Sequence, residues 1–529
     1  MLHTESPAGG DPGPTSEIAR RRTFAVISHP DAGKSTLTEA MALQARVVDE
    51  AGVTHGKASR QSTVSDWNDV ERERGISISS SVLRFDFAGK VVNLLDTPGH
   101  SDFSEDTYRV LMAVDFTVML IDAAKGMEPQ TRKLFDACRR LSLPVITVIN
   151  KCDRPGKEPL ELFDEIQEAT GRTPVAVNWP VGLPSAFQGL TTPGEDTYTW
   201  HEATQSGARV AREEVVAGAS DERLEPGAWS AASENALLAR ELNGAFDDEG
   251  FAGCEQTPVF FTAASSNLGV RAVMDFIAAH APAPSPRTAV AGHARELTSD
   301  FSGYVFKVQS GMNPAHRDQI AIVRVNSGTF ERGMDIRHAQ SGRPLNSKYA
   351  HHLVGRGRET AGLSWPGDIV GFVNVTGLKI GDTMHSGKRV EFPPMPRFNP
   401  ERFRVIRLTD SSQQKRFAKG IAQLEEDGTV QVFRTPDGSP RGPVLGAVGD
   451  LQFEVVKERL RREFGVETAY DELLPYEISR PLKGPNVESL KEVFGTGLLY
   501  RPDGEVIGVF RDKWKLERAL ERLPELFAA

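Results

Sequence analysis

The sequence predicts an α/β domain with a mostly parallel sheet and helices on both faces, followed by a β-barrel domain and a C-terminal α+β domain. Three observations lead to this fold class. Short apolar runs alternate with helical patterns over the first half of the chain, which is typical of a parallel sheet. Short strands separated by Gly turns follow and indicate a barrel. Strand and helix patterns then mix in the last part of the chain.

Apolar runs predict the strands of the first domain. They lie at residues 23–28, 91–95, 116–121, 145–149 and 257–261. One more strand is predicted at 83–87, before a Gly turn, and helices at 35–45, 128–141 and 270–280. In the last part we expect strands at 403–408 and 430–433 and helices at 415–426 and 451–463. Ligands bind beyond the C-terminal ends of parallel strands, so the loops after the apolar runs are candidate site residues.

Proline-rich segments divide the chain into domains at residues 21–286, 287–394 and 395–529. Residues 1–20 are polar and rich in Gly and Pro, so we expect a flexible leader there.

An insertion interrupts the first domain at about residues 188–256. Residues 195–249 within it hold 13 acidic and 4 basic side chains, and one helix is predicted at 233–242. The insertion therefore carries most of the net charge of −10.

Composition excludes several classes of protein. No apolar run approaches the ~18 residues of a membrane helix, so no membrane partner is expected. The 3 cysteines form no CxxC pair, which fits a reducing cytoplasm and argues against a structural zinc site. We expect a cytoplasmic monomer. Residues 397–420 carry seven basic side chains; they are either an RNA-binding face or a solvated charged surface.

A phosphate-binding loop is predicted directly after the first strand. The segment matches the pattern G-x-x-x-x-G-K-[ST] except that Ser28 replaces the first Gly. In such a loop backbone N–H groups surround the phosphates, Lys34 meets the β/γ oxygens and the Ser35 hydroxyl binds Mg²⁺. A surface turn is the alternative, and the flanking strand and helix favour the loop. Its residues are Ser28, His29, Pro30, Asp31, Ala32, Gly33, Lys34 and Ser35.

A second segment, Asp96, Thr97, Pro98 and Gly99, follows the strand at 91–95. Asp96 can hold Mg²⁺, and the Gly99 N–H can reach a γ-phosphate. The alternative is a simple capped turn.

A third segment, Asn150, Lys151, Cys152 and Asp153, follows the strand at 145–149. A carboxylate there can accept from both N1–H and the exocyclic amine of guanine, which adenine cannot offer, so the expected ligands are GTP and GDP. The Lys151 stem would cover the base, and Cys152 is a spacer. A weaker segment lies around Ala264, after the strand at 257–261.

Two further residues complete the expected chemistry. Ser77 can give Mg²⁺ a second hydroxyl and sense the γ-phosphate, although an ordinary loop serine is the alternative. His100 can orient the attacking water, because hydrolysis needs a positioned water more than a strong base. A histidine packed against the core is the alternative.

With these segments in order, the chain resembles the translational GTPases, and among them the bacterial release factor three family. The stretches that carry the resemblance are residues 27–35, 66–78, 93–108, 121–126 and 448–454. The resemblance implies a protein that binds ribosomal RNA and proteins, hydrolyses GTP late in termination and speeds the departure of class I release factors.

The resemblance also implies roles for single residues. His100 matches a water-orienting histidine and Asp31 an aspartate near the phosphates, while Ile76 and Pro30 flank the route of His100 to the nucleotide. Catalytic roles are therefore expected for His100, Asp31 and Ile76. The N–H of Ala264 would read the guanine oxygen.

Three alternatives stay open from the sequence. An elongation factor G-like or ribosome-protection factor would be longer, because only 133 residues follow Pro396 here. A non-ribosomal GTP switch would bind effectors instead of ribosomes. A GTP-independent RNA-binding scaffold would tolerate loss of Lys34 or Asp153.

Overall fold

Strand β1 (Arg21–Ser28) is buried along its whole length, which requires cover on both faces of its sheet. Ala25 and Ile27 face one hydrophobic cluster, whereas Phe24 and Val26 face another, as the twofold period of a strand demands. The computed structural model describes residues 13–46, 77–182, 187–201, 212–310, 319–354, 357–373, 375, 377–438, 442–484 and 486–527.

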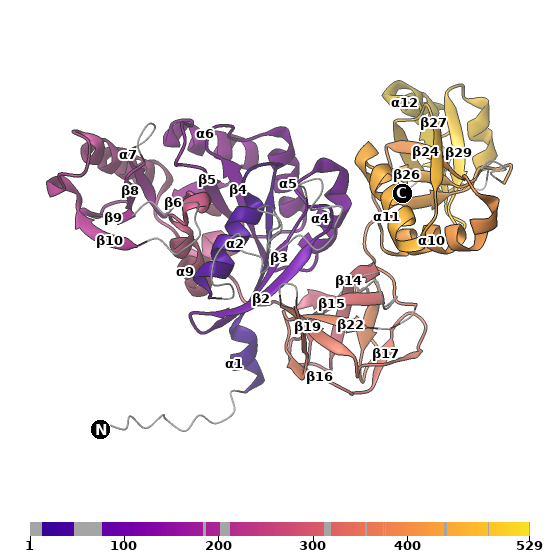
Figure 1. Ribbon diagram of the computed structural model, residues 1–529, viewed down its shortest axis with the longest axis horizontal. Coiled ribbons are helices and arrows are strands. Elements are labelled where there is room, and N and C mark those ends of the chain that lie inside the picture. Colours follow the sequence, from indigo (N-terminus) through magenta and orange to yellow (C-terminus); the bar gives the residue numbers. More distant parts are fainter. Residues whose placement is uncertain are drawn as a thin grey trace.

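The central sheet has the strand order β2-β3-β1-β4-β5-β11-β6. Its other members are β2 (Ser81–Phe87), β3 (Lys90–Asp96), β4 (Phe116–Asp122), β5 (Val145–Asn150), β6 (Thr173–Ala176) and β11 (Gln256–Phe261). Only β2 pairs in an antiparallel manner; the other neighbours are parallel. One face is covered by α2 (Lys34–Gln44) and α9 (Val270–His280) and the other by α4 (Ser104–Leu111), α5 (Pro129–Arg140) and α6 (Pro159–Thr170) (Figure 1). The predicted α/β fold is confirmed.

The insertion forms its own small layer beside β6. Its strands pair in the antiparallel order β10-β9-β8-β7, with bounds β7 (Trp179–Val181), β8 (Gly189–Thr191), β9 (Thr197–His201) and β10 (Glu213–Ala217). Two helices follow, α7 (Ala228–Asn243) and α8 (Asp248–Ala252). Helix α7 is longer than the predicted 233–242 and buries Ala232, Ala236 and Ala239 on one face. Its acidic side chains Glu234 and Glu241 are exposed.

The chain enters the first domain through a helix, α1 (Pro14–Ala19), which corrects the expectation of a flexible leader over residues 1–20. Two local ion pairs and one contact with the second domain explain the order. Glu17 accepts from Arg20 at 2.7 Å and pairs with Arg21, which also lies 3.3 Å from Asp368 of the second domain. Residues 1–12 are outside the described part of the chain.

The second domain covers the residues for which a β-barrel is predicted. Among the described residues it is a curled antiparallel sheet of eight strands (Figure 1). Their order is β18-β17-β23-β14-β15-β22-β19-β20. The bounds are β14 (Ser302–Ser310), β15 (Gln319–Ser327), β17 (Ile336–His338), β18 (Pro344–Leu345), β19 (Ala350–Val354), β20 (Gly357–Thr360), β22 (Ile369–Val373) and β23 (Thr383–His385). Two short pairs flank it: β12 (Arg287–Thr288) with β13 (Ala294–Arg295), and β16 (Phe330–Glu331) with β21 (Leu363–Ser364).

The third domain contains two sheets. The first comprises β24 (Arg402–Leu408), β25 (Gln431–Phe433), β26 (Val444–Ala447) and β27 (Thr468–Leu473), and it packs against α10 (Gln414–Glu426) and α11 (Asp450–Phe464). The second, absent from the sequence prediction, comprises β28 (Ile478–Leu482), β29 (Thr496–Tyr500) and β30 (Val506–Phe510) and packs against α12 (Lys513–Arg522). Phe403, Phe433 and Val509 fill the space between the two sheets. Within the described ranges, no helix has the length and apolar character needed to cross a bilayer.

Candidate nucleotide-binding site

The loop between β1 and α2 is shaped to receive an anion. Gly33 has φ 96°, and a Cβ there would lie 2.5 Å from Asn150 Nδ2, so a side chain would be both strained and obstructed. Gly33 is the N-cap of α2 and provides no side-chain cap, which leaves the first N–H groups of the helix for a bound anion. This geometry fits the phosphates of a nucleotide.

Lys34 and Asp96 bring two of the predicted segments together. The Lys34 ammonium donates to Asp96 Oδ1 at 2.6 Å, and both side chains are buried. Asp96 ends β3, which lies beside β1, and Thr97 Oγ1 donates to the Val26 carbonyl at 2.8 Å. A cation suited to phosphate oxygens and a carboxylate suited to a metal thus share one place.

The segment after Asp96 approaches the phosphate loop closely. A Cβ on Gly99 would lie 3.5 Å from Pro30 Cα, so the two backbones are almost in contact. His100 follows with a side chain that is 39% exposed. Asp31 is exposed and has φ 65°, a left-handed conformation that aspartate adopts more readily than most other non-glycine residues.

Two predicted residues lie at or beyond the edge of the described chain. Ser77 is half-buried and is the first described residue after the gap. Ile76 is outside the described residues.

Asn150 connects the phosphate loop with the weak fourth segment. Its Nδ2 donates to the Ala32 carbonyl at 2.9 Å. Its Oδ1 accepts from the Ala264 N–H at 3.0 Å and from Thr262 Oγ1 at 3.2 Å. In this conformation the Ala264 N–H, expected to read the guanine oxygen, is therefore donated to Asn150.

At the end of the site expected to bind the base, the structure adds Asp122, which is not among the site residues expected from the sequence. Lys151 donates from Nζ to Asp122 Oδ2 at 2.8 Å. Burial acts to raise the pKa of Asp122, but the bonds from Lys151 and the Ala124 N–H leave it lowered. The signal for Asp122 was available, because a carboxylate directly ends the buried strand β4. Asp153 is exposed, and Ser265 Oγ donates to its Oδ2 at 3.3 Å.

Two other loop residues are supporting rather than reactive. His29 is buried, with Nε2 2.8 Å from Glu128 Oε2 and Nδ1 3.4 Å from Thr131 Oγ1. Burial lowers the pKa of His29, although the Glu128 carboxylate opposes this. Burial also raises the pKa of Cys152 to about 12, which suits the spacer role expected from the sequence.

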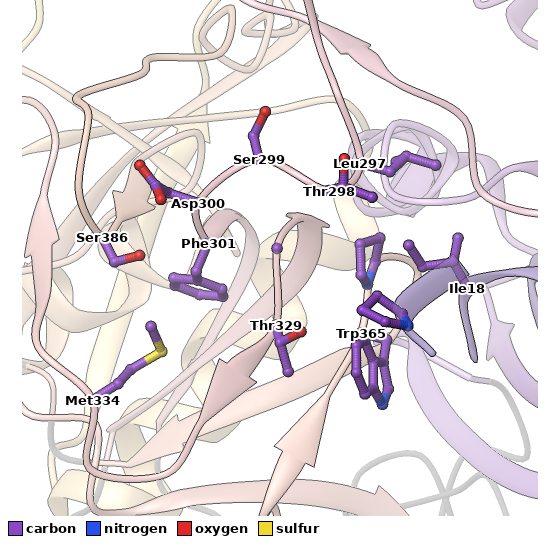
Figure 2. Close-up of a pocket in the computed structure, with 13 residues that line it drawn as sticks. Ile18, Leu297, Thr298, Ser299, Asp300, Phe301, Thr329, Met334, Trp365 and Ser386 are labelled. Carbon is purple, nitrogen blue, oxygen red and sulfur yellow. The ribbon is translucent and has the colours of Figure 1, made fainter. Parts of the chain in front are cut away.

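A cavity of about 320 Å³ lies elsewhere, between α1 and the second domain. Figure 2 shows Ile18 and Trp365 on one side of it and Phe301 and Met334 on the other. Asp300 is its one charged lining residue, and the Lys388 N–H already donates to that carboxylate at 3.1 Å. None of the predicted site residues lines this cavity among the described residues, so the candidate site is the edge of the sheet where the loops meet.

Fold and loops define the class: an α/β nucleotide-binding protein with a phosphate loop and two trailing domains. Family models agree along the chain. The Elongation factor Tu GTP binding domain matches residues 19–283, Elongation factor G domain 2 matches 300–387, and the C-terminal domain of class II release factor RF3 matches 392–520.

Curated relatives narrow the class. The chain is 42% identical to Peptide chain release factor 3 of Cyanothece sp., covering 97% of this chain and 95% of that protein. It is 43% identical to Peptide chain release factor 3 of Gloeobacter violaceus, covering 97% of each. The chain belongs to the peptide chain release factor 3 family. A crystal structure of a protein from Thermus thermophilus has the same fold, with a TM-score of 0.70 and 21% identity over 88% of this chain and 69% of that one.

Proposed function

We propose that this protein is a GTP-hydrolysing translation termination factor that binds the ribosome and promotes dissociation of class I release factors after peptide release. The observation that carries the proposal is that one chain joins a GTP-binding domain to the C-terminal domain of a class II release factor. Relatives named Peptide chain release factor 3 support it over almost the whole length. The domains proposed for this activity are residues 21–286, 287–394 and 395–529, and the protein acts as a monomer in the cytoplasm.

Different loops would bind different parts of the nucleotide. The loop Ser28–Ser35 and the Lys34 ammonium hold the phosphates, while Asp153 accepts from guanine and Lys151 covers the base. Ser35, Ser77 and Asp96 would hold Mg²⁺, which supplies positive charge to the phosphate oxygens when bound. Asn150 keeps the phosphate and base ends in register through Ala32.

Hydrolysis depends on a positioned water. His100 orients that water, with Asp31 near the phosphates and Ile76 beside the histidine's route. The His100 side chain is 39% exposed, so a partner surface can fix its orientation. We propose that the ribosome is that partner and that turnover without it is slow.

The test is the GTPase rate with and without ribosomes that carry a class I release factor. The proposal expects strong stimulation by such ribosomes and release of the bound factor. His100→Ala should bind GTP normally but lose roughly 10²-fold in the stimulated rate, as for a positioning residue. His293→Ala, at an exposed histidine, is the matched control. Equal rates with and without ribosomes would contradict the proposal, as would equal rates of the His100→Ala and wild-type proteins.

A further inference from the structure

Helix α11 of the third domain is capped by a residue of the first domain. Its N-cap is Gly449, which has no side chain to accept from the first N–H groups. Asp102 Oδ2 accepts from the Leu451 N–H at 2.9 Å instead. A Cβ on Gly449 would overlap the Asp102 carboxylate. Asp102 therefore takes the place that an N-cap side chain of α11 itself would occupy.

The same aspartate holds His100. The Asp102 N–H donates to His100 Nδ1 at 3.3 Å, and Asp102 Oδ1 lies 3.3 Å from that nitrogen. The backbone N–H and the carboxylate of Asp102 thus both face Nδ1 of the His100 ring. Asp102 is 16% exposed, so it is enclosed more tightly than the histidine it holds.

Apolar contacts reinforce this link. Phe103, the neighbour of Asp102, forms a buried cluster with Ile78, which follows Ser77, and with Leu451 and Val455 of α11. One turn of α11 thus contacts both segments expected to face the γ-phosphate. Figure 1 shows α4 and α11 on the facing sides of the first and third domains.

A polar contact extends the interface along α4. Arg109 donates to the Gly428 carbonyl of the third domain at 3.2 Å. A Cβ on Gly428 would overlap the Arg109 guanidinium, so this contact is also a close one. The third domain is therefore seated along α4 and not at Asp102 alone.

We infer that Asp102 is a positioning residue through which docking of the third domain sets the orientation of His100. The carboxylate is held by the N-terminus of α11, where a negative charge is favoured, so any displacement of α11 moves the turn that carries the histidine. A ribosome that repositions the third domain thereby controls GTP hydrolysis. This inference rests on the proposed role of His100.

Substitutions on the two sides of the contact test it. Asp102→Ala removes the acceptor and Gly449→Ala displaces it. Each is expected to lower the ribosome-stimulated kcat by roughly ten- to a hundred-fold, with the KM for GTP and the Kd for GDP unchanged. The double variant should be no slower than either single one, because both break the same contact. Asp102→Asn keeps an acceptor oxygen and should retain more of the rate than Asp102→Ala.

Controls separate the possible failures. Asp136→Ala removes a partly exposed carboxylate that pairs only with its helix neighbour Arg139 among the described residues, and it should behave as wild type. If His100→Ala is slow while Asp102→Ala is normal, the inference is wrong and the proposed function stands. If His100→Ala is normal, the proposed function fails first. Multiplying effects of Asp102→Ala and Gly449→Ala, or a raised Kd for GDP, would also overturn the inference.

Discussion

Asn150 Nδ2 donates to the Ala32 carbonyl at 2.9 Å, so a residue of the segment proposed to recognise the base holds the proposed phosphate loop in place. The same amide accepts from Ala264 through Oδ1. Three loops from separate strands therefore depend on one buried side chain.

Replacing Asn150 tests this dependence. Asn150→Ala leaves the Ala32 carbonyl and the Ala264 N–H without their partner, which costs about 1–3 kcal/mol for a buried polar group. We expect a lower unfolding midpoint and weaker GDP binding, measured by thermal unfolding and by nucleotide titration. Asn346→Ala, at an exposed asparagine, should change neither. Normal GDP affinity of Asn150→Ala would show that the link is dispensable.

Asp153→Asn tests the assignment of the base. The amide offers a donor where the carboxylate accepted, so preference should move from guanine toward xanthine nucleotides. Competition binding with GDP and xanthosine diphosphate measures the change. A variant that keeps its GDP preference would remove Asp153 from base recognition.

Lys307 is a buried cation between the first two domains. Its Nζ donates to Ser79 Oγ and to the Ser80 carbonyl, each at 2.6 Å, and lies 3.6 Å from Asp106 Oδ2. Asp106 is half-buried, so Lys307→Met would leave its carboxylate without this cation at a cost below the about 3–5 kcal/mol of breaking a fully buried pair. We expect a clearly lower apparent unfolding midpoint at pH 7. Lys379→Met, at an exposed lysine, is the control.

The Lys307 variant should also depend on pH. Burial acts to raise the pKa of Asp106, but Lys307, Arg109 and the Ser80 N–H leave it lowered. A lowered pKa gives stability above the unfolded value of about 3.9, which is lost as pH falls through the folded value. Lys307→Met raises the pKa of Asp106 relative to wild type, so the gap between the two unfolding midpoints should be largest at pH 7 and should close as the pH falls through the pKa of the variant toward the lower pKa of the wild type. A constant gap would mean that Asp106 is not the group involved.

Of the basic residues in 397–420 that could bind ribosomal RNA, the structure favours those on one face of α10. Arg397 pairs with Asp503 at 2.7 Å, and Arg404 lies 3.7 Å from Asp450 and over the rings of Phe453 and Tyr470. These arginines already have partners within their own domain. The exposed basic residues of α10 are Lys415, Arg416 and Lys419.

Alanine at all three positions of α10 should weaken ribosome binding and lower its salt slope by about one unit for each phosphate that the variant no longer neutralises. Arg139→Ala with Arg140→Ala, on the exposed face of α5, is the control. Sedimentation with ribosomes at several salt concentrations measures both. Equal slopes for the variant and wild type would remove α10 from the interface.

Local sequence patterns were sufficient to predict the strands and helices that position the loops of the candidate site. Continuous apolar runs predicted β4 and β5 because strands of a parallel sheet are buried on both faces. Helix α1 was missed because it has only six residues and because Arg21, which pairs with Glu17 of the helix, is itself held by Asp368, hundreds of residues away. The sheet of β28, β29 and β30 was missed because its strands are short and part of its cover comes from another sheet.

The same distinction holds for the site. The positions of the segments Ser28–Ser35 and Asn150–Asp153 at strand ends were predictable from the apolar runs before them, while their roles in nucleotide binding stay predictions. Asp102 could not be assigned from sequence, since its partner Leu451 belongs to another domain. Contacts across domains carry no local signal.

Direct binding of labelled GTP and GDP to the purified, folded protein tests the central claim most directly. The loops that meet at Lys34, Asp96 and Asn150 should bind both nucleotides, discriminate against ATP and lose binding in Lys34→Ala. A folded protein that binds neither GTP nor GDP at millimolar concentration would contradict the whole account.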